Sequence, residues 1–297
     1  MGSFWGHIDE GIFFILISVW WIFHACRQYC QTYVDGREMR PCISYSVRCK
    51  RDVPVETIFK ILFPLVGFLG EFLDGGVSLT DEHGNFRKLV YAQHMTIYGI
   101  FILHAVIDLF TWAGVPMIPG AAHVSGALSF AWYGVAFYYH SQMHGKEPLE
   151  AIVHVIPIPL MLLTALAILL ECRWRSGVWT MLTRSFCVLT IGTWFSHVAF
   201  MLYEHDKFPG GGSSGWDRSD IRNVQYARAC FGLHLLFNML FMLFCYVITY
   251  LVMRMRHSLH IPVAYYDESD DALGVRKKPV PSSDDSMESF FMQDSEY

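Results

Sequence analysis

Apolar residues in this chain are grouped into long blocks separated by polar connections. A helix needs about 20 mostly apolar residues to cross a bilayer. Seven blocks reach this length, at residues 11–34, 57–75, 88–112, 121–142, 149–172, 180–204 and 224–254. The fifth follows Pro148, and proline suits the first turn of a helix. The pattern predicts an all-α fold, a polytopic seven-transmembrane helix bundle that occupies residues 1–260.

The last segment, residues 261–297, differs in composition from these blocks. From Asp267 onward it holds nine acidic and three basic residues and is rich in Ser. The net charge of the whole chain, −5, therefore belongs to this segment, and the rest is close to neutral. Such a composition buries too little apolar surface to fold, so it predicts a disordered acidic C-terminal tail. The tail either solubilises the protein or is a phosphorylation-regulated adaptor segment, since Ser282 and Ser283 precede two aspartates.

Charged residues make up 16% of the chain, against about a quarter in a soluble domain. This low fraction disfavours a nucleic-acid-binding protein, a coiled coil or a disordered chain as the overall class. The eight cysteines are scattered and include no Cys-x-x-Cys pair, so we expect neither a disulfide framework nor a zinc ribbon.

Basic residues lie mostly on one side of the predicted bundle. Fifteen of the 22 fall in or beside the connections after the first, fifth and seventh blocks, with Lys60 and Arg184 counted at the flanks. Lysine and arginine accumulate on the cytoplasmic side of membrane proteins. The count predicts a lumenal or extracellular N-terminus and a cytoplasmic C-terminus, in an endomembrane or the plasma membrane.

The depth of a residue along its helix follows from a rise of about 1.5 Å per residue. These depths predict that histidines and carboxylates from six blocks form one layer near the outer side of the membrane. The layer comprises Glu71, His94, His140, His144, Glu150, His154, His197 and His234. His140 and His144 are four residues apart, as are Glu150 and His154, so each pair shares a helix face. Polar faces are costly to turn toward lipid, and we expect them to point inward at one another.

Imidazoles and carboxylates at one depth suit zinc or iron, which bind histidine nitrogen and carboxylate oxygen. The predicted metal ligands are His94, His144, His154, His197 and His234. Glu71 and Glu150 are the candidate catalytic residues, each as a general base or a supporting ligand. Taken singly, each of these histidines is better explained as a hydrogen-bonded packing residue, and the metal prediction rests on the group as a whole.

Two further polar residues of the third block, His104 and Asp108, are also four residues apart, nearer the cytoplasmic side. They would either share a hydrogen bond that fixes the packing or take part in a proton relay.

Several motifs resemble the transmembrane protein 45 family (domain of unknown function 716). The most specific is His144-Gly145-Lys146-Glu147-Pro148-Leu149-Glu150-Ala151-Ile152-Val153-His154, and Gln93-His94-Met95-Thr96-Ile97-Tyr98 and Ile107-Asp108 add to it. The resemblance implies a seven-span membrane protein and no particular substrate. Glu71, His94, Asp108, His144, Glu147, Glu150, His154 and His234 match polar positions of the family's motifs, whereas His140 and His197 do not.

Three classes of function fit these residues. The first is a membrane-embedded metalloenzyme that hydrolyses a lipid substrate with metal-activated water. The second is an ion- or proton-coupled transporter, which requires that the outer histidines connect to His104 and Asp108. The third is a trafficking or scaffold protein whose tail binds cytoplasmic adaptors. The lipid bilayer is the expected partner in every case, and no nucleic acid is expected.

Overall fold

A computed structural model describes residues 4–34, 39, 42–48, 52–75, 80, 83–84, 89–143, 145–174, 177–203 and 216–257. Within these ranges the chain forms α1 (Phe4–Val34), β1 (Val47–Arg48), β2 (Asp52–Val53), α2 (Val55–Gly75), α3 (Leu89–Trp112), α4 (Ala121–Ser141), α5 (Pro148–Val155), α6 (Ile158–Arg173), α7 (Val178–Leu202) and α8 (Ile221–His257). The fold is thus nearly all-α, as predicted. All described residues belong to the first of two compact units, 1–260 and 261–297. The predicted disordered tail lies outside them.

Helices cover all seven predicted blocks, and the fifth block is interrupted. α5 ends at Val155 and α6 begins at Ile158. Pro157 lies between them, where it lacks the N–H that a continuous helix would require. The Pro157 carbonyl then accepts hydrogen bonds from the amides of Leu160 and Met161, at 3.0 and 3.2 Å, which starts α6. One predicted span is therefore built from two helices.

Five of the described helical segments are long and apolar enough to cross a membrane. They are Phe4–Thr32, Leu89–Trp112, Pro148–Arg173 (α5 and α6 together), Val178–Leu202 and Ile221–Arg256. These segments indicate a membrane protein. α2 and α4 are not among the five, so length and hydropathy support fewer than the seven predicted crossings.

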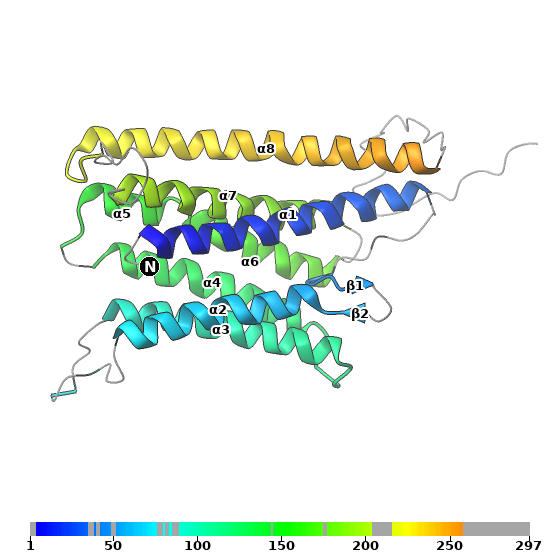
Figure 1. Cartoon of the computed structure of the whole chain (residues 1–297), viewed down its shortest axis with the longest axis horizontal. Helices are drawn as coiled ribbons and strands as arrows, with labels where there is room; N and C mark the ends of the chain where they lie inside the picture. Colours follow the sequence, from blue (N-terminus) through cyan, green and yellow to red (C-terminus); the bar gives the residue numbers. More distant parts are fainter. Residues whose placement is uncertain are drawn as a thin grey trace, which may run out of the picture. The chain divides into compact units, whose positions relative to one another are not determined.

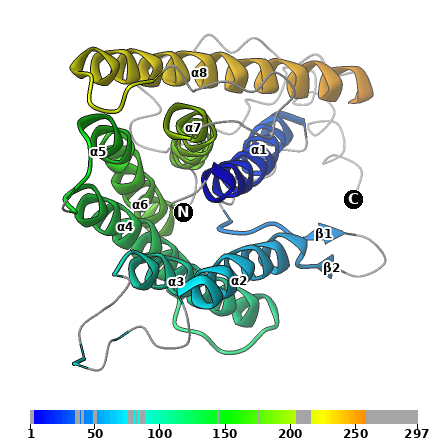
Figure 2. The ribbon, with the colours of Figure 1, turned by 60° about the vertical axis from the view of Figure 1, so that its left-hand side comes forward.

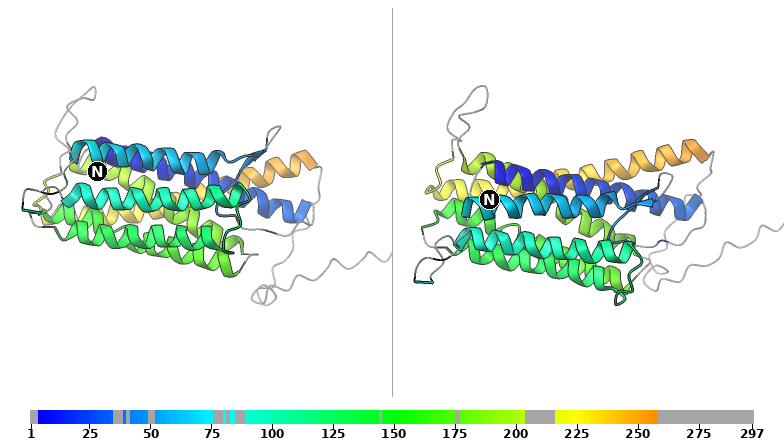
Figure 3. Two further views of the ribbon diagram at one scale, coloured as in Figure 1. Left: turned by 90° about the horizontal axis from the view of Figure 1, so that it is seen from below. Right: turned by 60° about the horizontal axis from the view of Figure 1, so that its bottom comes forward.

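The helices of the first unit pack into a ring in the order α1, α7, α6, α4, α3 and α2 (Figures 1 and 2). α8 lies outside this ring against α1, α5 and α7. α2 and α3 run side by side, as Figure 3 shows from below. α1, α3, α5 and α8 begin at one end of the bundle, where α2, α4 and α7 end. We call this the Phe4 end, and the opposite one the Val34 end.

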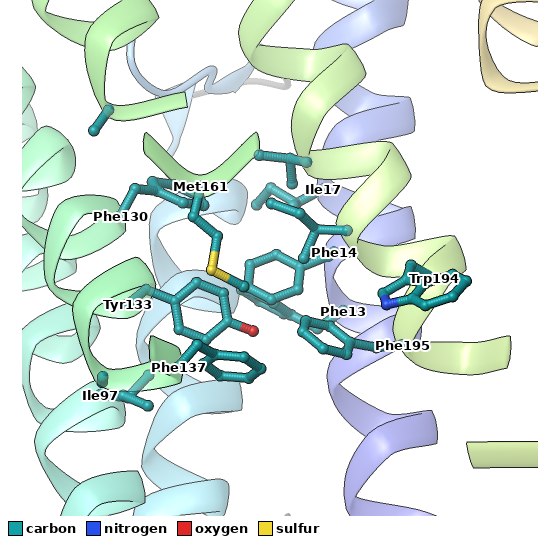
Figure 4. Packing of buried hydrophobic residues seen from close by; sticks show 14 of the residues in the cluster. Phe13, Phe14, Ile17, Ile97, Phe130, Tyr133, Phe137, Met161, Trp194 and Phe195 are labelled. Atoms are coloured by element: carbon teal, nitrogen blue, oxygen red, sulfur yellow. The ribbon is translucent and has the colours of Figure 1, made fainter. Parts of the chain in front are cut away.

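The interior of the ring is aromatic (Figure 4). The rings of Tyr133, Phe137 and Phe195, from α4 and α7, lie against one another, with Tyr133 and Phe195 fully buried. Phe14 of α1 contacts Tyr133 with a centroid distance of 5.7 Å. Burial of this apolar surface stabilises the arrangement that brings polar side chains together at the two ends.

α1 and α7 approach each other closely where Gly11 faces Gly192 and Ser196. A Cβ atom added to Gly192 would lie 2.8 Å from the Gly11 oxygen and 2.8 Å from the Ile15 nitrogen. Small residues four apart allow helix backbones in a membrane to meet in this way. The contact fixes the position of α1, which carries two residues of the site described next.

Candidate functional site

Four histidines meet at the Phe4 end of the ring, and we call them the histidine cluster: His7 of α1, His94 of α3, His140 of α4 and His154 of α5. Their rings form a row. The ring centroids are 5.4 Å apart for His94 and His140, 5.0 Å for His140 and His154, and 5.7 Å for His154 and His7. His7, His94 and His154 are at most 4% exposed. Four helices therefore contribute one buried imidazole site.

Hydrogen bonds determine the proton positions on two of these rings. His154 Nδ1 lies 2.6 Å from the Glu150 carbonyl oxygen, which only accepts, so Nδ1 carries the hydrogen. Lys146 Nζ donates to His140 Nε2 at 3.1 Å, so a neutral His140 carries its hydrogen on Nδ1. This Nδ1 is buried without a hydrogen-bond partner among the described residues. His140 thus presents one satisfied and one unsatisfied nitrogen.

Two glutamate carboxylates lie near the row of histidine rings. His94 Nδ1 lies 3.0 Å from Glu71 Oε1, and the Glu71 side chain is 11% exposed. Lys146 Nζ forms an ion pair with Glu150 Oε1 at 2.6 Å. Both predicted catalytic glutamates therefore lie at the site, Glu71 by direct contact with the cluster and Glu150 through Lys146 and its own carbonyl.

Glu10 extends the site from the histidines toward the centre of the bundle. It lies three residues after His7 on α1, is 5% exposed, and accepts a hydrogen bond from the Tyr133 hydroxyl. Its second oxygen, Oε2, is buried without a hydrogen-bond partner in the described part of the chain. A buried carboxyl oxygen of this kind is costly to leave unsatisfied, so its environment is suited to a proton, water or ion.

Tyr203 lies beside His7 at the Phe4 end of the bundle. Its ring centroid lies 5.4 Å from that of His7, and the Arg218 guanidinium lies 5.9 Å from the Tyr203 ring. Burial raises the pKa of Tyr203 to about 12. The phenol is therefore neutral at physiological pH and can donate a hydrogen bond but not act as an anionic base.

The structure brings together only part of the predicted metal site. Two of the five predicted ligands, His94 and His154, lie in the cluster with His140, and His144 lies outside the described residues. The described residues contain no group of three or more His, Cys, Asp or Glu side chains that could hold a metal ion. The zinc or iron prediction gains no support from this part of the chain.

The remaining two predicted ligands, His197 and His234, form a separate pair between α7 and α8. His197 Nδ1 lies 2.9 Å from His234 Nε2, and His234 Nδ1 lies 3.1 Å from Thr193 Oγ1. Asn238 adds a hydrogen bond to Thr193 at 2.9 Å. This is a polar contact between two helices, so the packing explanation fits these two histidines.

We expect the double-mutant cycle of His197→Ala and His234→Ala to give a coupling energy of about 0.6 kcal/mol and at most about 1.7 kcal/mol, the range for hydrogen bonds between membrane helices. The measurement is the free energy of unfolding in detergent micelles. A coupling of zero would show that the two rings do not stabilise each other, and a much larger one would point to a shared ligand.

Two residues of the site, His7 and Glu10, were missed in the sequence. The apolar pattern predicts a first block from Gly11, with both residues in the polar segment before it, whereas α1 begins at Phe4. Their spacing of three, next to an apolar run, was the available signal.

Five charged residues are buried toward the Val34 end, and we call them the charge network: Glu56, Lys60, Asp108, Glu171 and Arg184, each at most 6% exposed. Lys60 Nζ lies 2.6 Å from Glu56 Oε1 and 3.8 Å from Asp108 Oδ2. Arg184 Nε lies 3.2 Å from Glu171 Oε1. The sequence pattern predicts Lys60 and Arg184 as flanking bases on the cytoplasmic side, whereas the structure places both inside the bundle.

The charge network holds residues 42–45, the segment that leads into β1. Lys60 donates to the Ile43 oxygen at 3.0 Å, Arg184 to the Cys42 oxygen at 3.2 Å, and the Tyr45 amide to Glu56 Oε2 at 2.7 Å. Burial raises the pKa of the Cys42 thiol and of the Tyr45 phenol, so both stay neutral. A connection predicted only as a polar link between two spans is thus anchored in the interior.

His104 and Asp108 do not use each other as hydrogen-bond partners in the described structure. His104 Nδ1 lies 3.0 Å from Ser125 Oγ of α4. Asp108 accepts hydrogen bonds from Ser44 and from Thr57, the latter at 3.0 Å. The predicted His–Asp bond is therefore replaced by contacts of each residue with a different element.

A comparison with known protein families matches residues 119–247 to a family described as "Family of unknown function (DUF716)". The matched range runs from the start of α4 into α8, and it includes His140, Glu150 and His154. His7, Glu10, Glu71 and His94 lie before it. The match confirms the resemblance that the sequence motifs predicted, and residues 119–247 are similar to this family of unknown function.

Proposed function

We propose that this chain is a seven-span membrane protein that carries protons across the bilayer, with the histidine cluster as the proton-accepting site on its outer side. The observation that supports this function is the burial of ionisable side chains in both halves of one helical ring. The histidine cluster with Glu10 occupies the Phe4 end, and the charge network with His104 occupies the Val34 end. Buried histidines and carboxylates of this kind mark proton and ion pathways in membrane proteins.

The route between the two ends is interrupted by aromatic side chains. Tyr133, hydrogen-bonded to Glu10, contacts Phe14 and Phe101 with centroid distances of 5.7 and 5.9 Å. Phe101 in turn packs against Phe130 at 5.2 Å. Such a layer excludes water, so a carrier that rearranges fits the geometry better than a permanently open channel.

α2 and α4 complete the seven spans of this proposal, although their polar residues lower their hydropathy. Those residues lie inside the ring, where Glu56 and Lys60 of α2 and Ser129 of α4 are buried. Lipid-facing positions of the same helices are apolar and exposed, such as Val66 and Leu128. The excess of basic residues in and beside the sequence connections after the first, fifth and seventh blocks supports a cytoplasmic position for the Val34 end and a lumenal or extracellular N-terminus.

The purified full chain, reconstituted into liposomes that contain a pH-sensitive dye, tests the proposal. A potassium gradient with valinomycin drives proton entry. We expect wild-type protein to acidify the vesicle interior faster than protein-free liposomes do. Glu10→Gln is expected to lower the rate about tenfold or more, because it removes a titrating group that Tyr133 holds in place.

Asp9→Asn is the matched control, since Asp9 adjoins Glu10 on α1 but is exposed. It is expected to conduct as wild type does. Thermal unfolding of each variant shows whether a lower rate reflects loss of the fold. Wild-type liposomes that acidify no faster than empty ones, or a folded Glu10→Gln variant with the wild-type rate, would contradict the proposal.

The lipid-directed metallohydrolase has less support, since the described residues contain no group arranged to hold a metal ion. Elemental analysis of the same preparation tests it directly. One zinc or iron ion per chain in the wild type, lost in the His94→Ala/His154→Ala double variant, would favour the metalloenzyme over the proton carrier.

A further inference from the structure

The carbonyl group of Val153 has no donor from its own helix. In a continuous helix it would accept a hydrogen bond from the N–H of the residue four positions later. That residue is Pro157, which has no N–H. Val153 is fully buried, and a buried carbonyl group without a partner is costly in a membrane protein. The break between α5 and α6 therefore requires a donor from another helix.

Trp194 of α7, labelled in Figure 4, provides this donor. Its indole Nε1 donates to the Val153 oxygen at 2.9 Å, and the Trp194 side chain is fully buried. Three rings pack around the indole, with centroid distances of 5.0 Å to Phe231, 5.7 Å to His234 and 6.1 Å to His197. The indole would have to displace these rings to turn away from Val153, so the packing between α7 and α8 maintains the hydrogen bond.

The last turn of α5, to which Trp194 bonds, also carries His154 of the histidine cluster. The His154 ring lies between the rings of His140 and His7, at centroid distances of 5.0 and 5.7 Å. His154 Nδ1 donates to the Glu150 carbonyl oxygen at 2.6 Å, so the ring is tied to the backbone of this turn. The hydrogen bond from Trp194 holds the same backbone, and it therefore fixes the place of the His154 ring in the row.

Pro159 offers a comparison within the same predicted span. It also lacks an N–H, so the carbonyl group of Val155 has no helical donor either. In the described structure the indole of Trp194 bonds to the Val153 carbonyl, and Val155 is only partly buried. The two prolines are alike in their chemistry, so a difference between their variants reports on the bond from Trp194.

We infer that Trp194 is a positioning residue of the histidine cluster. Its indole N–H replaces the one that Pro157 lacks and holds His154 in line with His140 and His7. Trp194 acts through the Val153 carbonyl group and does not itself exchange a proton. The effect on transport rests on the proton carrier proposed above, whereas the position of the His154 ring can be measured without it.

Trp194→Phe in the purified full chain keeps an aromatic ring at this place and removes the N–H. It is expected to slow acidification in the liposome assay about tenfold or more, since a displacement of about 1 Å can cost about 100-fold in rate. Ring-nitrogen NMR spectra of histidine-labelled protein, with the His154 signals assigned by their loss in His154→Gln, should show these signals shifted. Trp179→Phe, at an exposed tryptophan of α7, is the matched control and should change neither readout.

Pro157→Ala tests the cause, because alanine returns an N–H to the chain. Ile156 and Pro157 both have right-handed helical dihedral angles, so this N–H would point toward the Val153 carbonyl group. Trp194→Phe/Pro157→Ala should regain most of the wild-type rate and the wild-type His154 signals, whereas Trp194→Phe/Pro159→Ala should not. If Trp194→Phe does not fold, the two double variants are compared by thermal unfolding, and only the one with Pro157→Ala is expected to fold.

A folded Trp194→Phe variant with the wild-type rate or the wild-type His154 signals would overturn the inference. Equal behaviour of the Pro157→Ala and Pro159→Ala double variants would also overturn it, because the bond to Val153 would then not be the cause. Wild-type liposomes that do not acidify would instead count against the proposed proton carrier, and the His154 signals alone would then decide the role of Trp194.

Discussion

Gly192→Ala is expected to lower the free energy of unfolding by about 3 kcal/mol or more, from the addition of a single methyl group. The new Cβ would lie 2.8 Å from the Gly11 oxygen, 2.8 Å from the Ile15 nitrogen and 2.9 Å from Phe14 Cβ. Two of these three atoms belong to the backbone of α1, so no rotamer change relieves the clash. α1 must move away from α7, and His7 and Glu10 move with it.

The measurement is the free energy of unfolding in detergent micelles, with Gly232→Ala as the matched control. Gly232 lies within α8, and a Cβ added there meets no atom within 4 Å. Alanine also has a higher helix propensity than glycine by about 1 kcal/mol, so this control should be neutral or stabilising. Equal stability of the two variants would show that α1 and α7 are not in the close contact described.

The positions of the helices could be predicted from hydropathy because lipid and core both select apolar residues in blocks about one membrane thickness long. The first block was placed seven residues too late, since His7 and Glu10 interrupt the apolar run although they are buried. The break between α5 and α6 was also missed. Pro157 was visible, but proline is tolerated in membrane helices, so its presence alone does not predict an interruption.

The candidate site was predicted in part. Depth and helical spacing correctly grouped His94, His140 and His154 with Glu71 and Glu150, because these depend only on the rise per residue. They also grouped His197 and His234 with the others, whereas in the structure these two pair with each other between α7 and α8. Depth gives the layer of a residue but not the face of the ring on which its helix packs.

Apart from Asp108, the charge network could not be predicted, because its residues look like ordinary flanking charges. Lys60 and Arg184 stand near the ends of apolar blocks, where lysine and arginine commonly extend to the membrane surface. Their burial depends on residues 42–45, whose carbonyl groups accept their hydrogen bonds. A contact between a loop and two helices leaves no periodic pattern in the sequence.

Glu56→Ala is expected to destabilise the protein by about 3–5 kcal/mol, the cost of removing one partner of a buried ion pair. Glu56 is 4% exposed and accepts hydrogen bonds from the indoles of Trp20 and Trp21, at 3.0 and 2.8 Å, and from the Tyr45 amide at 2.7 Å. Alanine leaves these donors and the Lys60 ammonium group without their shared acceptor. Residues 42–45 would then lose one of their anchors.

The double variant Glu56→Ala/Lys60→Met separates charge from packing. Glu56→Ala leaves the buried positive charge of Lys60 without its nearest carboxylate, and methionine at position 60 removes that charge. The double variant should therefore be more stable than Glu56→Ala alone. The measurement is the free energy of unfolding in detergent micelles. Glu147→Ala, at an exposed glutamate, is the control and should change stability by less than about 0.5 kcal/mol. If Lys60→Met gives no recovery, Asp108, 3.8 Å from Lys60, is sufficient to balance its charge, and the destabilisation by Glu56→Ala comes from the lost hydrogen bonds alone.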